Sequence, residues 1–366
     1  MPSDHLQSIA FSEIEGWKED DHNKALSAFC LSATEILREG RSFTRPSQFG
    51  GKREDWLDVC RKALAAVDGK SFFENEFHAF NVSDKAQSLF TGYYEPQALG
   101  SITPTRDYFV PIYAKPHDLV AFTAEERQAS RISYGRRSSG PSPYFNRREI
   151  EAGALKDQGL ELCYLSNWQE VYFIHIQGNG RVLLPDGKAL RLSFAAKNGH
   201  DYKSIGRLLL DRGIGTAQTM SMQFLKSWMR DNPEAARQLM WQNPSFVFFS
   251  AGDQIDPAVG ASGAAKVPLT PLRSLAVDRS YWAFGTPVFL STHLPPETGG
   301  DAFQKLMIAQ DTGSAIKGVL RGDVYFGWGP QAEVAAGHMK QPGQMLVLLP
   351  KPVAKRFLPK GFCNEC

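Results

Sequence analysis

The 366-residue sequence predicts a mainly β protein that also contains α-helical elements. The chain holds 32 Gly, 22 Pro, 24 Phe, 11 Tyr and 7 Trp, a composition typical of short strands separated by turns. Residues 20–66 contain two segments with apolar residues at helical spacing. From Ser88 onward, short β-branched and aromatic runs alternate with Gly, Pro, Asp and Asn, as in an all-β region.

The first part of the chain predicts helices and then strands. The helices of residues 20–66 are carried by SAFCLSATEILREG and WLDVCRKALAAV. The strands that follow are predicted in LFTGYY, YFVPIY, VYFIHIQ and RVLL. Helices are predicted again within residues 201–240, where an amphipathic helix ends near Asn232 and Pro233.

The last hundred residues return to strands. These are predicted between Val267 and Pro350, in VPLT, LAVD, TPVFLST, KLMIAQD, DVYFG and MLVLLP. The small, glycine-rich stretch AVGASGAAK, residues 258–266, is predicted to be a flexible loop within this β region rather than a domain linker.

The charge balance argues against two classes of partner. The 41 basic and 39 acidic residues give a net charge of +2 with both signs interspersed, so the concentrated basic face of a nucleic-acid or membrane-surface protein is not expected. No run of about 18 apolar residues suggests a transmembrane helix. The opening MPSDHLQSIAFSEIEGWKEDD has no basic segment followed by an apolar one, so no secretory signal is readable.

The five cysteines fit neither a dense disulfide framework nor a complete zinc site. Cys30 and Cys60 lie in the two predicted N-terminal helices and either form a disulfide in an oxidising compartment or remain free thiols. Cys363 and Cys366 are predicted to belong to a terminal tail without a role in the fold, with a disulfide or metal role as the alternative.

Common catalytic and cofactor motifs are missing from the sequence. It contains no Gly-x-Ser-x-Gly and no His-Glu-x-x-His, and the eight histidines are scattered. The stretch QGNGR, residues 177–181, lacks the Lys-Ser/Thr pair of a phosphate-binding loop. We therefore expect neither a metal ion nor an organic cofactor.

Three aspartates, Asp278, Asp311 and Asp323, lie where hydrophobic strands meet turns. Such residues often only shape turns. Grouped carboxylates beside aromatic residues are also typical of enzymes that cleave glycosidic bonds. An aspartate that acts as an acid needs its pKa raised above about 3.9, by burial or by a second carboxylate. Strand alternation places Tyr325 on the same face as Asp323, and Asp311 can supply the like charge.

Several ordered motifs between residues 88 and 350 resemble the membrane-bound lytic transglycosylase A family. They are FTGYYEP, YFVPIY, NRREI, FIHIQGNGRV, AQDTGSAIKG, RGDVYFGWG and AAGHM. The resemblance implies a double-psi β-barrel domain, formed by residues 1–96 and 256–366 together with the N-terminal helices. A second, small β-barrel domain of residues 97–255 would be inserted into it, and a groove would separate the two.

The resemblance also implies a reaction. It is the cleavage of the β-1,4 bond between N-acetylmuramic acid and N-acetylglucosamine in peptidoglycan without water, which leaves a 1,6-anhydro end. Asp323 would serve as acid and then as base, and Asp311 would support the site. The implied substrate contacts are Thr91, Tyr93, Tyr94, Gln177, Gly178, Asp278, Lys317 and Tyr325. For the tyrosine pair, Gly178, Asp278 and Lys317, a purely structural or solvated role is the alternative.

Rival functions and the location remain open at this level. A hydrolase on the same barrel would use a second carboxylate to deliver water, and a glycan-binding module would use the groove without catalysis. Peptidoglycan strands are the implied partner, and cell-wall synthesis or hydrolysis machinery is a further implied partner. The protein is expected to be a monomer. The substrate implied by the resemblance would place the protein in the periplasm or at the outer membrane, although no lipid-attachment cysteine precedes Cys30. His175 and Asn179 depart from the family pattern.

Overall fold

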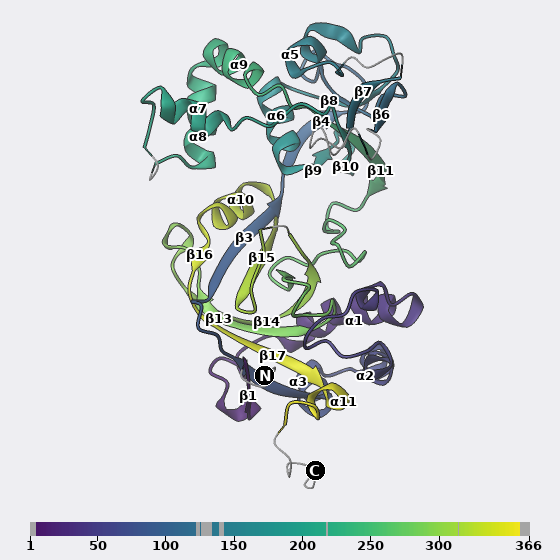
Figure 1. The fold of residues 1–366 in the computed structure, drawn as a ribbon, viewed down its shortest axis with the longest axis vertical. Helices are drawn as coiled ribbons and strands as arrows, with labels where there is room; N and C mark the ends of the chain where they lie inside the picture. The colour runs from purple at the N-terminus through teal and green to yellow at the C-terminus, as the bar shows by residue number, and fades with distance from the viewer. Residues whose placement is uncertain are drawn as a thin grey trace. The chain divides into compact units, whose positions relative to one another are not determined.

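The computed structural model describes residues 5–121, 125, 134–138, 143–216, 219–313 and 315–358. It is a mixed α/β structure whose chain divides into two compact units (Figure 1). Unit 1 contains residues 1–94 and 259–366, and unit 2 contains residues 95–258. Unit 2 was predicted to contain residues 97–255. In the structure it begins two residues earlier and ends three residues later.

Unit 1 is built on a nine-stranded sheet with the order β1-β2-β17-β13-β14-β12-β15-β3-β16. Its strands are β1 (Leu6–Ile9), β2 (Phe77–Val82), β3 (Leu89–Glu95), β12 (Ser274–Val277), β13 (Pro287–His293), β14 (Ala302–Asp311), β15 (Arg321–Trp328), β16 (Lys340–Gln341) and β17 (Gln344–Pro350). Its helices are α1 (His22–Arg38), α2 (Glu54–Ala65), α3 (Gly69–Glu76), α10 (Gly329–His338) and α11 (Lys351–Ala354).

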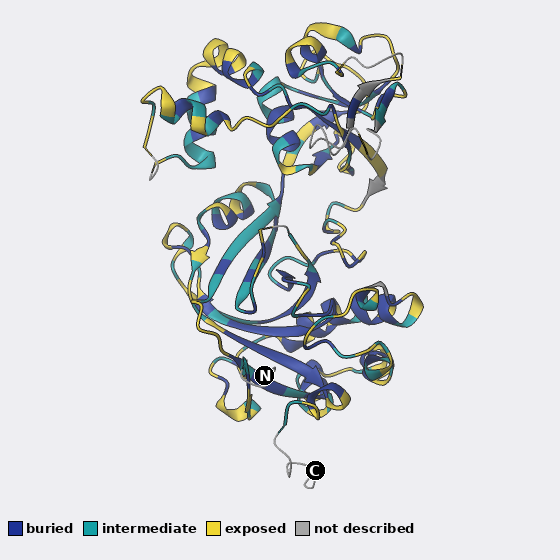
Figure 2. Ribbon diagram, in the orientation of Figure 1, coloured by how far each residue is buried: buried dark blue, intermediate teal, exposed yellow. Residues whose placement is uncertain are grey.

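The core of unit 1 joins the N-terminal helices to the sheet. Strands β13, β14 and β17 are buried along most of their length (Figure 2). Helices α1 and α2 confirm the helical prediction for residues 20–66, and their apolar faces contribute Phe29, Ile36 and Trp56 to the same hydrophobic cluster as the strands. Burial of these large apolar side chains is what fixes the helices against the sheet.

Unit 2 contains a six-stranded sheet with the order β11-β10-β9-β4-β8-β5 and a two-stranded sheet, β6-β7. Its strands are β4 (Gln97–Ser101), β5 (Val110–Tyr113), β6 (Leu119–Ala121), β7 (Tyr134–Arg137), β8 (Glu161–Leu165), β9 (Asn179–Leu183), β10 (Ala189–Lys197) and β11 (Val247–Ile255). Its helices are α5 (Arg147–Glu149), α6 (Trp168–Gln177), α7 (Ile205–Asp211), α8 (Met222–Asp231) and α9 (Pro233–Trp241).

Helix α6 corrects one strand prediction. The run VYFIHIQ, residues 171–177, is helical although its β-branched and aromatic residues favour a strand. The side chain of Asn167 accepts a hydrogen bond from the backbone N–H of Glu170, which begins the helix. Gly178, with φ of 71°, ends it in the left-handed conformation. The two caps and burial on several faces outweigh the intrinsic strand preference.

The segment after β11 corrects one further strand prediction. Of VPLT, only Pro268 forms an isolated β-bridge, with Ser262. The glycine-rich stretch of residues 258–266 begins at the boundary between the units, and from Val259 onward it belongs to unit 1 and forms a hydrogen-bonded turn. In that turn the N–H of Ala265 donates to the carbonyl of Gln310.

Arg181 on β9 ties together the two ends of unit 2. Its guanidinium donates from Nε and Nη2 to Glu95 Oε2, at 2.9 and 2.6 Å, and from Nη1 to the carbonyl of Pro257. Its backbone N–H donates to the carbonyl of Pro96. The Arg181 and Glu95 side chains are fully buried, and Arg191 also pairs with Glu95. The first residue of unit 2, Glu95, and its second-to-last residue, Pro257, are thus both hydrogen-bonded to Arg181 on β9.

The described cysteines, Cys30, Cys60 and Cys163, are free thiols, so the Cys30–Cys60 disulfide alternative is wrong for this structure. Burial, and secondarily the neighbouring Cys30, raises the pKa of Cys60 to about 12, which keeps it protonated. Cys363 and Cys366 lie outside the described residues. Within the described part of the chain, no helix combines the length and apolar character needed to cross a membrane.

Candidate active site

Four adjacent strands of unit 1, in the order β14-β12-β15-β3, bring together residues far apart in the sequence. Ala276 on β12 lies opposite Asp311 of parallel β14 on one side and opposite Asp323 of antiparallel β15 on the other. On β3, Thr91 and Tyr93 are two residues apart and so share one face. The strand register therefore places two of the three aspartates beside the FTGYYEP motif.

Asp323 is half-buried, and its Oδ1 lies 2.5 Å from the hydroxyl oxygen of Thr91. Burial raises the pKa of Asp323 above its ordinary value. The hydrogen bond from Thr91 and the charge of Arg321 oppose this increase, and the charge of Asp311 adds to it. A carboxyl group in this environment is suited to carry a proton and to release it to a substrate.

Asp311 is held by three donors. Its Oδ2 accepts a 3.0 Å hydrogen bond from the Tyr93 hydroxyl, and its Oδ1 accepts 2.9 Å bonds from the backbone N–H groups of Ala264 and Thr312. Burial and the charge of Asp311 raise the pKa of Tyr93 well above its ordinary value, so Tyr93 remains a donor. These three hydrogen bonds fix the Asp311 side chain in one orientation.

The contact between Tyr93 and Asp311 shows that the sheet curves around this site. In a flat sheet, β3 and β14 would be about 14 Å apart, at about 4.8 Å for each strand spacing. Gly92 allows close packing behind the site, because a Cβ atom there would lie 2.6 Å from the ring of Phe326 and 2.9 Å from the Cα of Ala336. Any larger residue would push β3 away from β15 and α10.

Asp278 follows β12 and has a different environment from the other two aspartates. Its Oδ1 accepts from the backbone and hydroxyl of Ser280, and its Oδ2 accepts a 2.8 Å bond from the N–H of Gly318. Burial acts to raise the pKa of Asp278, but these hydrogen bonds and the charge of Lys317 lower it overall. The geometry favours a structural role that ties two turns together, with the exposed Lys317 nearby.

The remaining tyrosines of unit 1 support the site from within. Tyr325 is buried, and its ring centroid lies 5.2 Å from that of Tyr93. Tyr94 is half-buried, and burial together with the Glu333 carboxylate, to which it is hydrogen-bonded, raises its pKa. These contacts are typical of packed side chains. A structural role of this kind is the alternative to sugar contact that was given for the tyrosine pair from the sequence.

Gln177 and Gly178 belong to unit 2, at the C-terminal end of α6. Gln177 is exposed, and both residues line a cavity of about 680 Å³ together with Phe194, Lys197 and Tyr202. All the residues that line the cavity belong to unit 2.

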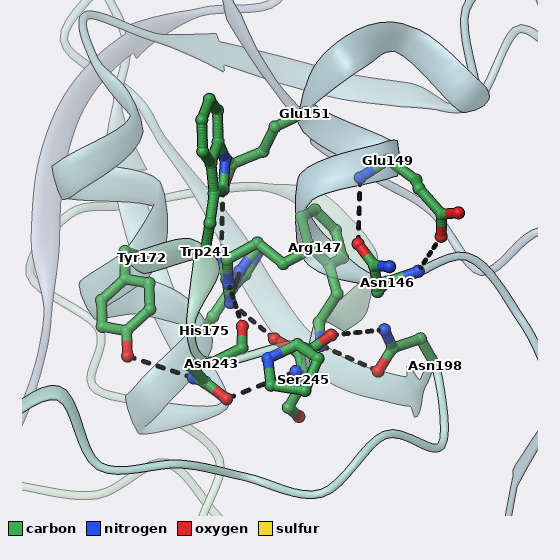
Figure 3. A network of polar contacts seen from close by, with 12 residues as sticks. Asn146, Arg147, Glu149, Glu151, Tyr172, His175, Asn198, Trp241, Asn243 and Ser245 are labelled. Carbon is green, nitrogen blue, oxygen red and sulfur yellow. Dashed lines mark hydrogen bonds and ion pairs between the residues drawn. The ribbon is translucent and has the colours of Figure 1, made fainter. Parts of the chain in front are cut away.

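The buried Arg147, which also lines this cavity, organises a polar network (Figure 3). Its guanidinium pairs with Glu151 at 3.3 Å and donates to the carbonyl oxygens of Asn243 and Ser245. Nη2 of Arg147 lies 3.2 Å from Nδ1 of His175. Because arginine can only donate, Nδ1 of His175 accepts and the neutral ring carries its proton on Nε2. This explains His175 as a packing partner that orients the end of α6.

Two contacts of the site were not predicted from the sequence. Arg321 reaches Thr91, and the backbone N–H of Ala264 reaches Asp311. The only sequence signal for Arg321 was its place two residues before Asp323, on the same face of a strand. The contact of Ala264 is made by its backbone N–H, which nearly every residue type has, so the residue type does not indicate it. Among the described residues, no group of three or more His, Cys, Asp or Glu side chains is arranged to hold a metal ion.

Comparison with known families identifies both parts of the chain. Residues 89–250 match the model of the MltA specific insert domain, and residues 273–349 match that of the 3D domain. The chain belongs to the membrane-bound lytic murein transglycosylase A family. The family resemblance of the sequence motifs is thereby confirmed.

Relatives of the family align over most of the chain. The membrane-bound lytic murein transglycosylase A of Vibrio cholerae is 35% identical over 262 residues, which is 70% of this chain and 64%, less than two thirds, of that protein. The crystal structure of the Agrobacterium tumefaciens membrane-bound lytic murein transglycosylase has 34% identity and a TM-score of 0.75, and covers 97% of this chain and 100% of its own. Escherichia coli MltA with bound chitohexaose has 30% identity and a TM-score of 0.63, covering 89% of this chain and 90% of its own.

Proposed function

We propose that this protein is a peptidoglycan lytic transglycosylase that cleaves the bond between N-acetylmuramic acid and N-acetylglucosamine without water and leaves 1,6-anhydro ends. The observation that carries the proposal is the environment of Asp323. This half-buried carboxyl has a raised pKa, one oxygen held by Thr91, and a second carboxylate close by. The family membership and the chitohexaose bound to the Escherichia coli relative support a glycan substrate.

In the proposed reaction, Asp323 first acts as the acid. It transfers its proton to the glycosidic oxygen while the bond to the anomeric carbon breaks and positive charge develops on the sugar. The ionised Asp323 then accepts the proton of the sugar's own C6 hydroxyl, whose oxygen forms the new bond to the anomeric carbon. The intramolecular nucleophile has a large effective concentration, so water is not required.

Asp311 has a supporting role in this proposal. Its negative charge helps to keep the proton on Asp323 and stabilises the positive charge on the sugar. A hydrolase would use a second carboxylate to activate water, but three of the roughly four acceptor positions of Asp311 are already used by Tyr93, Ala264 and Thr312. Its environment therefore favours the transglycosylase over the hydrolase.

The finer features of the fold and the substrate contacts are part of the same proposal. We infer that the curved sheet of unit 1 closes as a double-psi barrel and that unit 2 forms a second small barrel. Gln177 and Gly178 would contact the glycan from unit 2, while Thr91, Tyr93, Tyr94, Asp278, Lys317 and Tyr325 would bind or support it from unit 1. The protein would act as a monomer on peptidoglycan in the periplasm or at the outer membrane.

Analysis of the products tests the function. Purified peptidoglycan is digested, and the new glycan ends are identified by mass spectrometry. We expect anhydro ends from the wild type and at least about a 100-fold lower rate from Asp323→Asn, because general acid catalysis contributes roughly 10²–10⁴-fold. The exposed Asp301→Asn serves as the matched control and should keep the wild-type rate. Reducing ends would indicate a hydrolase, and glycan binding without cleavage would indicate a binding module.

A further inference from the structure

The guanidinium of Arg321 lies beside the proposed acid and is fixed by three hydrogen bonds. Nη1 donates to the carbonyl oxygens of Leu89, at 3.1 Å, and Gly322, at 2.7 Å. Nη2 donates to the hydroxyl oxygen of Thr91 at 2.8 Å. The two carbonyl contacts anchor the planar guanidinium on β3 and β15, so its direction toward Thr91 is set by the backbone.

The direction of each hydrogen bond follows from the donors available. Arginine has no acceptor, so the Thr91 oxygen accepts from Arg321. The Thr91 hydroxyl has one proton, and its other contact among the described residues is Oδ1 of Asp323. If Thr91 donates to Asp323, its hydroxyl proton has a hydrogen-bond acceptor. If Thr91 instead accepted a hydrogen bond from Asp323, its hydroxyl proton would have no acceptor among the described residues. Oδ1 of Asp323 is therefore an acceptor.

We propose that Arg321 is a positioning residue that acts through the Thr91 hydroxyl to keep the acid proton of Asp323 on Oδ2. No hydrogen-bond partner of Oδ2 is found in the described part of the chain, so this oxygen is available to a substrate. The inference rests on the proposed function of Asp323 and adds which oxygen reacts and what selects it. Thr91 thereby becomes a partner of the acid rather than a direct sugar contact.

The charges around Asp323 agree with this arrangement. Burial raises the pKa of Asp323, Thr91 and Arg321 lower it, and Asp311 on β14 raises it. Tyr93 on β3 and Tyr325 on β15 are the other titratable groups near the site, and burial keeps Tyr93 neutral. Strand β12 contributes only Ala276 at this position. Thr91 and Arg321 thus stabilise the carboxylate that forms after the proton has left.

The reaction then uses one oxygen of Asp323 throughout. The Oδ2 proton passes to the glycosidic oxygen as the glycosidic bond breaks. Oδ2 next takes the proton of the C6 hydroxyl as that oxygen bonds to the anomeric carbon. Oδ1 keeps its hydrogen bond from Thr91 in both steps, so the site needs no rearrangement of the acid between them.

The test compares Thr91→Val, which removes the hydroxyl but keeps the shape, with Thr91→Ser, which keeps the hydroxyl. For Thr91→Val we expect kcat to fall about tenfold with KM nearly unchanged, and the basic limb of the kcat/KM profile to move to higher pH. Thr91→Ser should restore both. Arg321→Met should move the limb in the same direction, and adding it to Thr91→Val should produce less than the sum of the single effects.

A second readout does not depend on turnover. The carboxyl carbons of aspartate are followed by ¹³C NMR during a pH titration, with Asp323→Asn used to assign the signal. The pKa of Asp323 should rise in Thr91→Val and in Arg321→Met, and stay near that of the wild type in Thr91→Ser. Circular dichroism checks that each variant is folded.

The two readouts separate the inference from the proposed function. An unchanged Asp323 titration in folded Thr91→Val would overturn the role of Thr91, and fully additive effects of the two substitutions would overturn the action of Arg321 through it. Altered titrations in a protein that releases no anhydro ends would leave the hydrogen-bond chain intact and refute the transglycosylase function instead.

Discussion

The buried Arg147–Glu151 pair of unit 2 leads to a strong prediction about stability. The Arg147 and Glu151 side chains are 1% and 0% exposed, and Glu151 has one further donor, the indole N–H of Trp241 at 2.8 Å. Arg147→Met would leave the Glu151 carboxyl buried without its cation and the carbonyl oxygens of Asn243 and Ser245 without a donor. We expect a loss of about 3–5 kcal/mol in the free energy of unfolding, as for other broken buried pairs.

The double variant Arg147→Met/Glu151→Leu separates the charge from the other contacts. It removes both ions, so the remaining cost is that of the unsatisfied carbonyl and indole groups, about 1–3 kcal/mol. Urea unfolding followed by tryptophan fluorescence and circular dichroism measures both variants, with the transition of unit 2 analysed separately. The reasoning is refuted if Arg147→Met costs less than about 1 kcal/mol, or if the double variant is less stable than Arg147→Met alone.

Two further predictions concern pH. Burial, and secondarily Arg147, holds the pKa of His175 well below its ordinary value, so its contribution to stability is present above about pH 6.5 and is lost as the pH falls. His175→Gln should therefore show a smaller decrease in unfolding free energy between pH 7 and 5 than the wild type; equal slopes would contradict this. Burial acts to raise the pKa of Asp278, but hydrogen bonds from Gly318 and Ser280 lower it overall. Asp278→Asn should lower the free energy of unfolding by about 1–2 kcal/mol at pH 7 and by less at pH 3. An equal decrease at both pH values, measured by urea unfolding, would show that the ionised carboxylate does not stabilise the fold.

The sequence predicted those parts of the fold in which local pattern and burial agree. The helices of residues 20–66 and the strands β13, β14, β15 and β17 have clear apolar periodicity, and the structure confirms them. VYFIHIQ was misassigned because its residues favour strands while its two caps and its burial impose a helix. Pattern reasoning weighs residue types and gives too little weight to a cap at each end.

Only those parts of the site that have a characteristic residue type or motif could be predicted from the sequence. The turn positions of Asp311 and Asp323 and the FTGYYEP motif drew attention to side chains that the strand register brings together. The Arg321–Thr91 contact depends on the pairing of β15 with β3, which lies outside the reach of local pattern. The carboxylate roles of Asp311 and Asp323 themselves remain predictions until the variants are measured.

The sheet order of unit 1 has a consequence for how the protein is made. Strand β2 pairs with β17, and the register partner of Phe80 is Val347, near the other end of the chain. This pairing can form only after Val347 has been synthesised. During synthesis, unit 2 is completed while β2 still lacks β17 and β3 still lacks β15 and β16. The edge of β2 that pairs with β17 has no strand partner throughout this interval, which makes it a site for chaperone binding or aggregation. Emergence of β17 from the ribosome, rather than folding of the inserted unit, then sets when unit 1 can form.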